Sequence, residues 1–460
     1  MHGFGLPVRR VLLLILGFFL LTASGRIGNR DVAITVDLSR SLLVGSVAVP
    51  DHWKGAPFRP EGGRTSQYGI GHSLSLIPYL LCGRSVAAIL PIASGTDWEE
   101  FFVNFSNVPV VLLLLYQLAR RWRGLGAQGQ HIAAGLVLVA IATPIGPYAR
   151  IPFSDGLLAL GIFAAWCRWM EGGFRSSIVS GLWLGVACVS RRQADLVIPS
   201  LMCLMAVHAA ASNRWRNLAT AVIATLPAVA LRLAYNQARF GSPFMEIHPG
   251  LRVDRLVDGA MSHPLAFNLN EVLLSSNHGL LIYGVVPIGV CFLGIRPLWR
   301  ESIWDGIAAI WIPMTGVLTM AKLGFGPGTS FGCRYLIFAL PFLLLAWPGI
   351  EVPKGWLSRL ACALPVAGSV GLMAIGFTLD PLPIETRMKR SIPPMGHFTA
   401  CGREWGRVLG FDAGSESLEL RADTGWNHDP FRRPDFWWCH AVDRLRSGRG
   451  VAPQIPASGK

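Results

Sequence analysis

Long apolar segments alternate with short polar turns along most of the chain. A helix that crosses the hydrocarbon core of a bilayer needs about 20 largely apolar residues. About eleven segments approach this requirement, at roughly 11–23, 101–119, 131–149, 156–171, 176–190, 196–211, 217–235, 279–295, 303–322, 335–349 and 357–378. The pattern predicts an all-α polytopic membrane protein with about 11 transmembrane helices.

The composition agrees with a membrane protein and excludes several other classes. Hydrophobic residues make up 52% of the 460 positions and charged residues only 15%, whereas soluble proteins carry about 25% charged residues. The mean hydropathy is +0.44. A soluble multidomain, disordered, collagenous or disulfide-stapled chain is therefore excluded. The nine cysteines form no CxxC pair, and most lie in apolar runs, where free Cys behaves as a small hydrophobic residue.

The net charge of +14 suggests two partners, a nucleic acid or the lipid headgroups of a membrane. Lys and Arg gather at every second loop between the predicted helices, which favours the membrane. The positive-inside rule places these loops in the cytoplasm, and no nucleic acid is implied. The loops contain Arg120, Arg121 and Arg123; Arg168 and Arg175; Arg214 and Arg216; Arg296 and Arg300; and Lys354 and Arg359.

The other loops are then expected at the outer face of the inner (plasma) membrane. They cover residues 25–100, 150–155, 191–195, 236–278, 323–334 and the tail 379–460. The first of them contains two short apolar segments, 69–81 and 86–92, which we expect to lie along the membrane surface as amphipathic helices. A spanning helix there would invert every later loop and break the charge pattern.

These assignments divide the chain into four parts. Residues 1–24 form a first helix, either a retained signal anchor, which we favour, or a cleaved signal peptide. An outer loop with interfacial helices (25–100) follows, then a multi-helix transmembrane domain (101–378) and an outer, periplasmic C-terminal segment (379–460). The N-terminus is expected in the cytoplasm and the C-terminus outside.

Acidic residues occur in two of the predicted outer loops. Asp31 follows the first helix, and Asp37 lies six residues later. A carboxylate at the helix–water boundary can accept the proton of an attacking hydroxyl group, although residue type alone favours a solvated loop Asp. Asp155 opens the fourth helix, where it serves either as a catalytic acid or as an N-cap and helix-dipole partner.

Basic residues occur in three other predicted outer loops. Arg191 and Arg192 form a short turn, and Arg334 ends a Gly-rich loop that leads into a helix. Guanidinium groups bind phosphate oxygens in bidentate fashion, so these residues are candidates for holding a lipid phosphate; ordinary headgroup contact is the alternative. His278 opens the eighth helix and either binds phosphate or caps that helix.

The order of these segments resembles bacterial C-type (GT-C) membrane glycosyltransferases, a group that includes protein O-mannosyltransferases and the aminoarabinose transferase of lipid A. The resemblance covers about residues 10–350. It is carried by Asp31 with Ser41-Leu42-Leu43; by Gln67-Tyr68-Gly69-Ile70-Gly71 with Leu76-Ile77-Pro78; by Thr143-Pro144 with Pro147-Tyr148-Ala149 and Ser154-Asp155; by Tyr235-Asn236 with Phe240-Gly241-Ser242-Pro243; by Ser275-Ser276-Asn277-His278-Gly279-Leu280 with Tyr283 and Pro287; and by Gly332-Cys333-Arg334-Tyr335-Leu336 with Leu340-Pro341.

The resemblance implies that a sugar carried on polyprenyl phosphate is used at the outer face. Asp31 would be the base or acceptor-orienting residue, with Asp155 as the second acid. Many relatives have Asp-Glu in the first loop, whereas Val32 follows Asp31 here. Some relatives use a divalent metal ion and others use none, so the two acids leave the metal undetermined.

The sequence thus favours a glycosyltransferase that moves a sugar from a polyprenyl-phosphate donor to a glycan, lipid or protein acceptor. In this hypothesis Asp31 activates or orients the acceptor, while Arg192 and Arg334 stabilise the departing phosphate. Two other functions remain open: a flippase or transporter of lipid-linked sugars, and a non-catalytic subunit of an envelope polysaccharide assembly system. A one-sided cluster of polar residues favours an enzyme, because transporters line a two-sided path at mid-bilayer depth.

Overall fold

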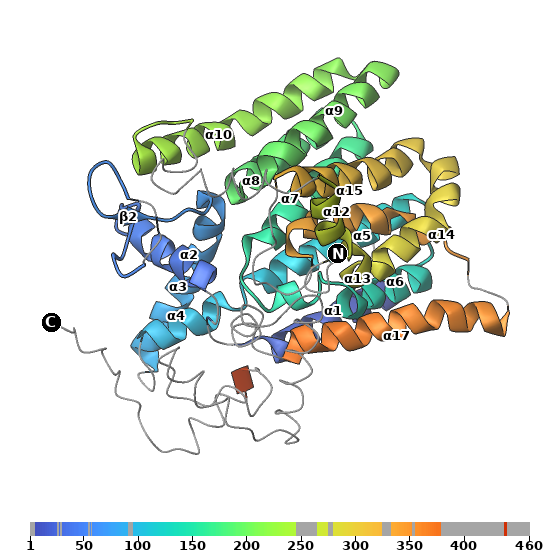
Figure 1. Ribbon diagram of the computed structural model, residues 1–460, viewed down its shortest axis with the longest axis horizontal. Helices are drawn as coiled ribbons and strands as arrows, with labels where there is room; N and C mark the ends of the chain where they lie inside the picture. Colours follow the sequence, from blue (N-terminus) through green and yellow to red (C-terminus); the bar gives the residue numbers. More distant parts are fainter. Residues whose placement is uncertain are drawn as a thin grey trace.

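A computed structural model gives the structure of the protein (Figure 1). It describes residues 5–24, 27, 30–53, 56, 58–90, 95–244, 265–274, 279–323, 333–351, 355–378 and 437–438. Within these residues the fold is almost entirely helical, as the sequence predicts. The only regular strands of the described part are β1 (Ala48–Val49) and β2 (Arg64–Thr65), a short antiparallel pair in the predicted first outer loop.

Most predicted membrane segments correspond to single helices. They are α1 (Leu6–Thr22), α5 (Asn107–Gly124), α7 (Ser154–Glu171), α8 (Phe174–Ser190), α9 (Ala194–Ser212), α10 (Trp215–Phe240), α15 (Ile303–Leu323) and α17 (Trp356–Thr378). Five helical stretches in the described part are long and apolar enough to cross a membrane: Gly95–Gly124, Ala194–Ser212, Trp215–Phe240, Ile303–Ala321 and Trp356–Ala374. The predicted count of 11 spans stays a prediction.

Three predicted segments are broken because proline or glycine interrupts them. The segment 131–149 forms α6 (Gly129–Ala142) and a separate turn, η1 (Pro147–Ala149); Pro144 and Pro147 lack the N–H that would continue the helix. The segment 279–295 divides into α13 (Leu280–Tyr283) and α14 (Val285–Glu301) around Gly284. The segment 335–349 is a run of short pieces, η2 (Arg334–Ala339), α16 (Leu340–Leu343) and η3 (Leu344–Gly349).

The predicted first outer loop contains more helix than the sequence indicates. The apolar segments 69–81 and 86–92 belong to one helix, α3 (Ile70–Ile89), and α2 (Arg30–Leu42) and α4 (Gly95–Val103) flank it. The hydroxyl group of Ser39 on α2 donates to the carbonyl of Ser73 on α3 at 2.9 Å. Helices α3 and α4 approach closely at Gly83, where a Cβ atom would lie 2.6 Å from the backbone of Glu99. Figure 1 shows the three helices grouped at one side of the bundle.

Helix α7 passes through the centre of the bundle and carries polar contacts at both ends. Near its C-terminus the indole N–H of Trp166 donates to Asp305 of α15 at 3.0 Å, and Arg121 of α5 forms an ion pair with the same carboxylate. We call Arg121, Trp166 and Asp305 the Asp305 cluster. Asp155 lies in the first turn of α7, eleven residues before Trp166, which corresponds to about 16 Å along the helix axis.

Candidate active site

The turn that leads into α7 is fixed by a side chain from the start of α5. Asn107, which is buried, donates from Nδ2 to the carbonyl groups of Ile151 at 2.6 Å and Phe153 at 2.9 Å. A third, longer contact at 3.2 Å reaches the carbonyl of Tyr148. An irregular segment keeps its shape when its buried carbonyl groups have donors, so Asn107 determines where the turn delivers Asp155.

His72 of α3 holds the same turn from the side of the predicted outer loop. Its Nε2 lies 2.7 Å from the carbonyl oxygen of Pro152, and the hydroxyl of Ser75 lies 3.5 Å from its Nδ1. Burial lowers the pKa of His72 to about 4, so the ring is neutral at neutral pH. The contact requires the tautomer whose Nε2–H donates to Pro152.

Asp155 itself does not cap α7. The N-cap residue is Phe153, and it makes no side-chain capping bond, so the predicted N-cap role for Asp155 is wrong. The residue lies in the first turn, where a carboxylate is favoured by the helix dipole. Its side chain is only 4% exposed, and a buried charge needs charged partners.

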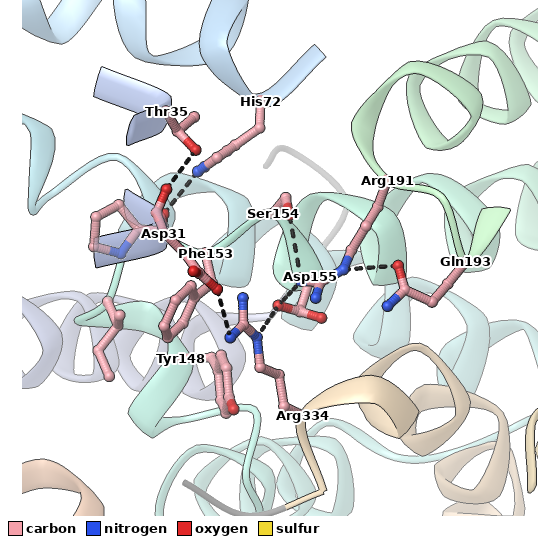
Figure 2. Close-up of polar contacts among 12 residues, drawn as sticks. Asp31, Thr35, His72, Tyr148, Phe153, Ser154, Asp155, Arg191, Gln193 and Arg334 are labelled. Atoms are coloured by element: carbon pink, nitrogen blue, oxygen red, sulfur yellow. Dashed lines mark hydrogen bonds and ion pairs between the residues drawn. The ribbon is translucent and has the colours of Figure 1, made fainter. Parts of the chain in front are cut away.

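Two arginines from distant segments supply those partners, as Figure 2 shows. Arg334 donates from Nε to Oδ2 of Asp155 at 3.0 Å, and Arg191 forms a second ion pair with the same oxygen. The side-chain oxygen of Gln193 accepts a bond from Nε of Arg191 at 2.8 Å. Asp155 therefore holds two guanidinium groups side by side.

Asp31 completes the group from the first turn of α2. Its Oδ2 lies 3.3 Å from Nη1 of Arg334, so that arginine bridges the two acids. The side chain of Asp31 is 35% exposed, compared with 4% for Asp155. A ligand can thus reach Asp31, whereas Asp155 lies behind its arginines. We call Asp31, Asp155, Arg191 and Arg334 the Asp155 cluster.

Aromatic rings line the guanidinium groups of this cluster. The guanidinium carbon of Arg334 lies 3.8 Å from the ring centroid of Phe153, and that of Arg191 lies 5.1 Å from the centroid of Tyr335. Stacking on a ring fixes a guanidinium plane and leaves its edge available for hydrogen bonds. The arrangement suits the recognition of an oxyanion by the guanidinium N–H groups that Asp31, Asp155 and Gln193 do not engage.

Tyr68 is a site residue that we assigned no role from the sequence. Its hydroxyl group donates to the carboxylate of Asp31 and accepts a bond from Nε2 of Gln67 at 2.8 Å. Burial, together with the negative charge of Asp31, raises the pKa of the Tyr68 phenol far above its usual value. The phenol therefore stays protonated and remains a donor to Asp31.

The backbone around Tyr68 is tied to the end of α10. Arg239, which is buried, donates from Nη1 to the carbonyl groups of Ser66 at 2.8 Å and Tyr68 at 3.2 Å. Its guanidinium carbon lies 4.1 Å from the ring centroid of Tyr235. These bonds connect α10 to the segment that precedes α3. The only sequence signal for this contact was the appearance of both segments among the motifs of the resemblance.

The remaining candidates are placed differently. Arg192 is exposed at the turn where Arg191 contacts Asp155. His278 lies outside the described residues. Asp37 accepts bonds from Nη1 of Arg40 at 2.8 Å and from the indole of Trp53 at 2.8 Å. These contacts show Asp37 as part of the packing of α2, and Asp31 as the acid of that helix which faces Arg334.

The donor set of the Asp155 cluster is better suited to an anion than to a metal ion. Its two carboxylates are already paired with guanidinium groups. Within the part of the chain that the structure describes, no group of three or more His, Cys, Asp or Glu side chains is arranged to hold a metal. Two arginines that share a buried carboxylate, one of them beside the partly exposed Asp31, can bind a phosphate next to a base.

The helical bundle is similar in fold to a solved protein structure. The chain superposes on the crystal structure of ArnT from Cupriavidus metallidurans bound to undecaprenyl phosphate. The TM-score is 0.53 with 14% identical residues, and the alignment covers 87% of this chain and 78% of that chain. The likeness confirms the predicted fold class.

A second structure of the same protein, in the apo state, gives a TM-score of 0.48 and 11% identity over the same shares of the two chains. No protein-family model matches the sequence, and no curated protein matches it.

Proposed function

We propose that the protein is a membrane glycosyltransferase that moves a sugar from a polyprenyl-phosphate donor to an acceptor hydroxyl group at the outer face of the inner membrane. The acceptor is a glycan, a lipid or a protein. The observation that carries the proposal is the position of Arg334, which stacks on Phe153 and joins the partly exposed acid Asp31 to the buried acid Asp155. Cation and base thus meet at one point.

In the proposed reaction each charged group has a role. The acceptor oxygen attacks the anomeric carbon of the donor while its proton passes to the carboxylate of Asp31. The bond between that carbon and the phosphate oxygen breaks, and its electron pair stays on the polyprenyl phosphate. Arg334 and Arg191 stabilise this charge, as preorganised cations do at a developing oxyanion. Asp155 keeps the two arginines in place.

Two further observations support the proposal. The first is the fold shared with ArnT, whose structure holds undecaprenyl phosphate, the lipid phosphate that this mechanism requires. The second is the contact of Trp437 with the C-terminal end of α1. It brings Trp437 to the end of α1 from which the chain continues to Asp31, in agreement with an outer location for both residues.

The ion pair between Asp31 and Arg334 also suggests an order of events. Phosphate and the carboxylate of Asp31 compete for the guanidinium of Arg334, which here lies 3.3 Å from Asp31. A donor phosphate that engages Arg334 weakens this pair and leaves the carboxylate oxygen to the acceptor hydroxyl. The base is thus released where and when the donor is bound.

Purified protein in proteoliposomes distinguishes the proposal from its alternatives. Polyprenyl phosphates that carry different radiolabelled sugars are supplied together with membrane extract as the source of acceptors. We expect label to leave the lipid fraction and free polyprenyl phosphate to accumulate. Movement of intact lipid-linked sugar across the bilayer without its consumption would instead show a flippase. If the protein binds the donor but neither transfers the sugar nor moves the lipid across the bilayer, a non-catalytic subunit is favoured.

A further inference from the structure

The C-terminal end of α1 is covered by two tryptophans that lie more than 400 residues away in the sequence. The last carbonyl groups of a helix have no partner within the helix. Here the indole N–H of Trp437 donates to the carbonyl of Leu20 at 2.9 Å, and that of Trp438 donates to Leu21 at 3.1 Å. The backbone N–H of Trp437 donates to the carbonyl of Ala23 at 2.9 Å.

Helix α4 strengthens this contact and extends it toward the site. The ring of Phe101 meets the ring of Trp437 edge to face, with 5.8 Å between the centroids. The preceding residue, Glu100, accepts a hydrogen bond from the backbone N–H of Ile27. One turn of α4 therefore contacts both Trp437 and Ile27, which lies between α1 and α2, four residues before Asp31.

We propose that Trp437 and Trp438 form a clamp on the end of α1 that positions Asp31. The clamp holds Ala23 and α4 holds Ile27. Together these contacts keep the start of α2 where Asp31 lies beside Arg334. This role rests on the proposed function of Asp31. The two tryptophans are positioning residues and contact no substrate.

Tryptophan is also common at membrane interfaces for reasons unrelated to a site, because its ring is amphipathic. That explanation requires only the ring, whereas the clamp requires the indole N–H groups directed at successive carbonyl oxygens. Replacement by phenylalanine separates the two explanations, since phenylalanine keeps an aromatic ring and removes the donor.

The test uses the full-length protein in lipid nanodiscs and the double variant Trp437→Phe/Trp438→Phe. Hydrogen–deuterium exchange of the peptide that covers residues 20–31 is compared with steady-state transfer kinetics. We expect faster exchange and a kcat that falls about tenfold, because small misplacements of reacting groups are costly. KM for the lipid donor should stay within about twofold, since the arginines are untouched. Trp356→Phe, at the exposed start of α17, is the matched control and should change nothing.

Phe101→Leu approaches the clamp from α4 and leaves both tryptophans in place. It should raise exchange in the same peptide by less than the double variant does. Wild-type exchange in the double variant would overturn the clamp, and faster exchange with unchanged kcat would overturn its role in positioning Asp31. If the wild-type protein shows no transfer at all, the proposed function fails together with that role, while the exchange comparison still decides whether the clamp exists.

Discussion

The two arginine–carboxylate clusters at the ends of α7 are similar in composition and different in access. In the Asp305 cluster the carboxylate is fully buried, and Arg121 and Trp166 occupy its oxygens. In the Asp155 cluster a second carboxylate, Asp31, is 35% exposed beside Arg334. The Asp305 cluster is closed by its own residues, whereas the Asp155 cluster presents one acid to a ligand.

This difference separates a charge pair that holds helices together from one that can do chemistry. A buried pair must be fully satisfied, because the loss of either partner leaves an isolated charge in a medium of low dielectric constant. A catalytic acid must instead stay reachable and keep its orientation through neighbours. Asp155 is a buried, fully paired carboxylate, whereas Asp31 stays reachable, and Arg334 contacts both.

The largest expected effect is the loss of transfer in Asp31→Asn. The amide cannot accept the acceptor's proton, so kcat should fall by about 10²- to 10⁴-fold. Transfer from radiolabelled lipid donor in nanodiscs measures this directly. Asp37→Asn is the matched control on the same helix, since Asp37 contacts Arg40 and Trp53 and should keep transfer near the wild-type rate per folded molecule.

Asp305→Ala should act on stability instead. It leaves the mostly buried Arg121 without its carboxylate, which costs about 3–5 kcal/mol. We expect a sharp decrease in the monodisperse fraction after detergent extraction and a lower midpoint of thermal unfolding. Trp166→Phe removes only one neutral donor from the same carboxylate and should cost about 1 kcal/mol. Equal effects of the two variants would contradict the account of this cluster.

Arg334→Gln should weaken the binding of undecaprenyl phosphate. The loss of a charge-assisted bond to phosphate corresponds to about 1.5–3 kcal/mol, or roughly a 10- to 100-fold higher Kd. Arg191→Gln should show a similar change. Arg232→Gln is the control, because Arg232 forms an ion pair with Asp195 outside the cluster. Native mass spectrometry of the protein in nanodiscs measures this Kd. An unchanged Kd for Arg334→Gln would show that Arg334 does not bind the phosphate.

His72 should make the stability of the protein depend on pH. Its pKa is about 4 in the fold and about 6.5 in an unfolded chain, so the unfolded state binds more protons between these values. Stability is therefore complete above pH 6.5 and decreases as the pH falls toward 4, by at most about 3 kcal/mol. In His72→Gln the amide can still donate to Pro152 without titrating. This variant should lose less stability between pH 6.5 and 4.5 in thermal unfolding; parallel curves would contradict the assignment.

Tyr68→Phe should have the smallest effect. It removes the hydroxyl donor to Asp31 and leaves the backbone bonds to Arg239 in place. One such bond corresponds to about 1 kcal/mol, or roughly a fivefold decrease in kcat, with little change in Kd for the lipid phosphate. A pH–rate profile for transfer identifies the cause: the limb that reports the base should move only if Tyr68 acts through Asp31.

Much of the fold follows from the sequence for simple reasons. Apolar length marks the helices, and alternation of basic loops groups the polar connections into two sets. The structure brings Asp31, Asp155, Arg191 and Arg334 together from four connections of one set, as that grouping requires. The helix breaks at Pro144 and Gly284 also follow from the residues at those positions, although the hydropathy pattern alone does not predict them.

The partners within the site were not predictable in the same way. Arg334 and Asp31 are 303 positions apart, and no periodic pattern specifies which acid meets which arginine. Asn107, Tyr68 and His72 were assigned no role, because the sequence around a polar residue does not indicate which distant group it will hydrogen-bond. Asp305 was overlooked for the same reason, since it begins a span whose apolar pattern dominates.

The most direct test of the central claim compares Asp31→Asn with wild-type protein in two assays on the same nanodisc preparation. The first measures binding of undecaprenyl phosphate, and the second measures transfer from the labelled donor. We predict binding at least as tight as that of wild type, because the anion no longer competes with a carboxylate for Arg334, together with transfer lowered by about 10²-fold or more. Transfer at the wild-type rate by well-folded Asp31→Asn protein would contradict the account.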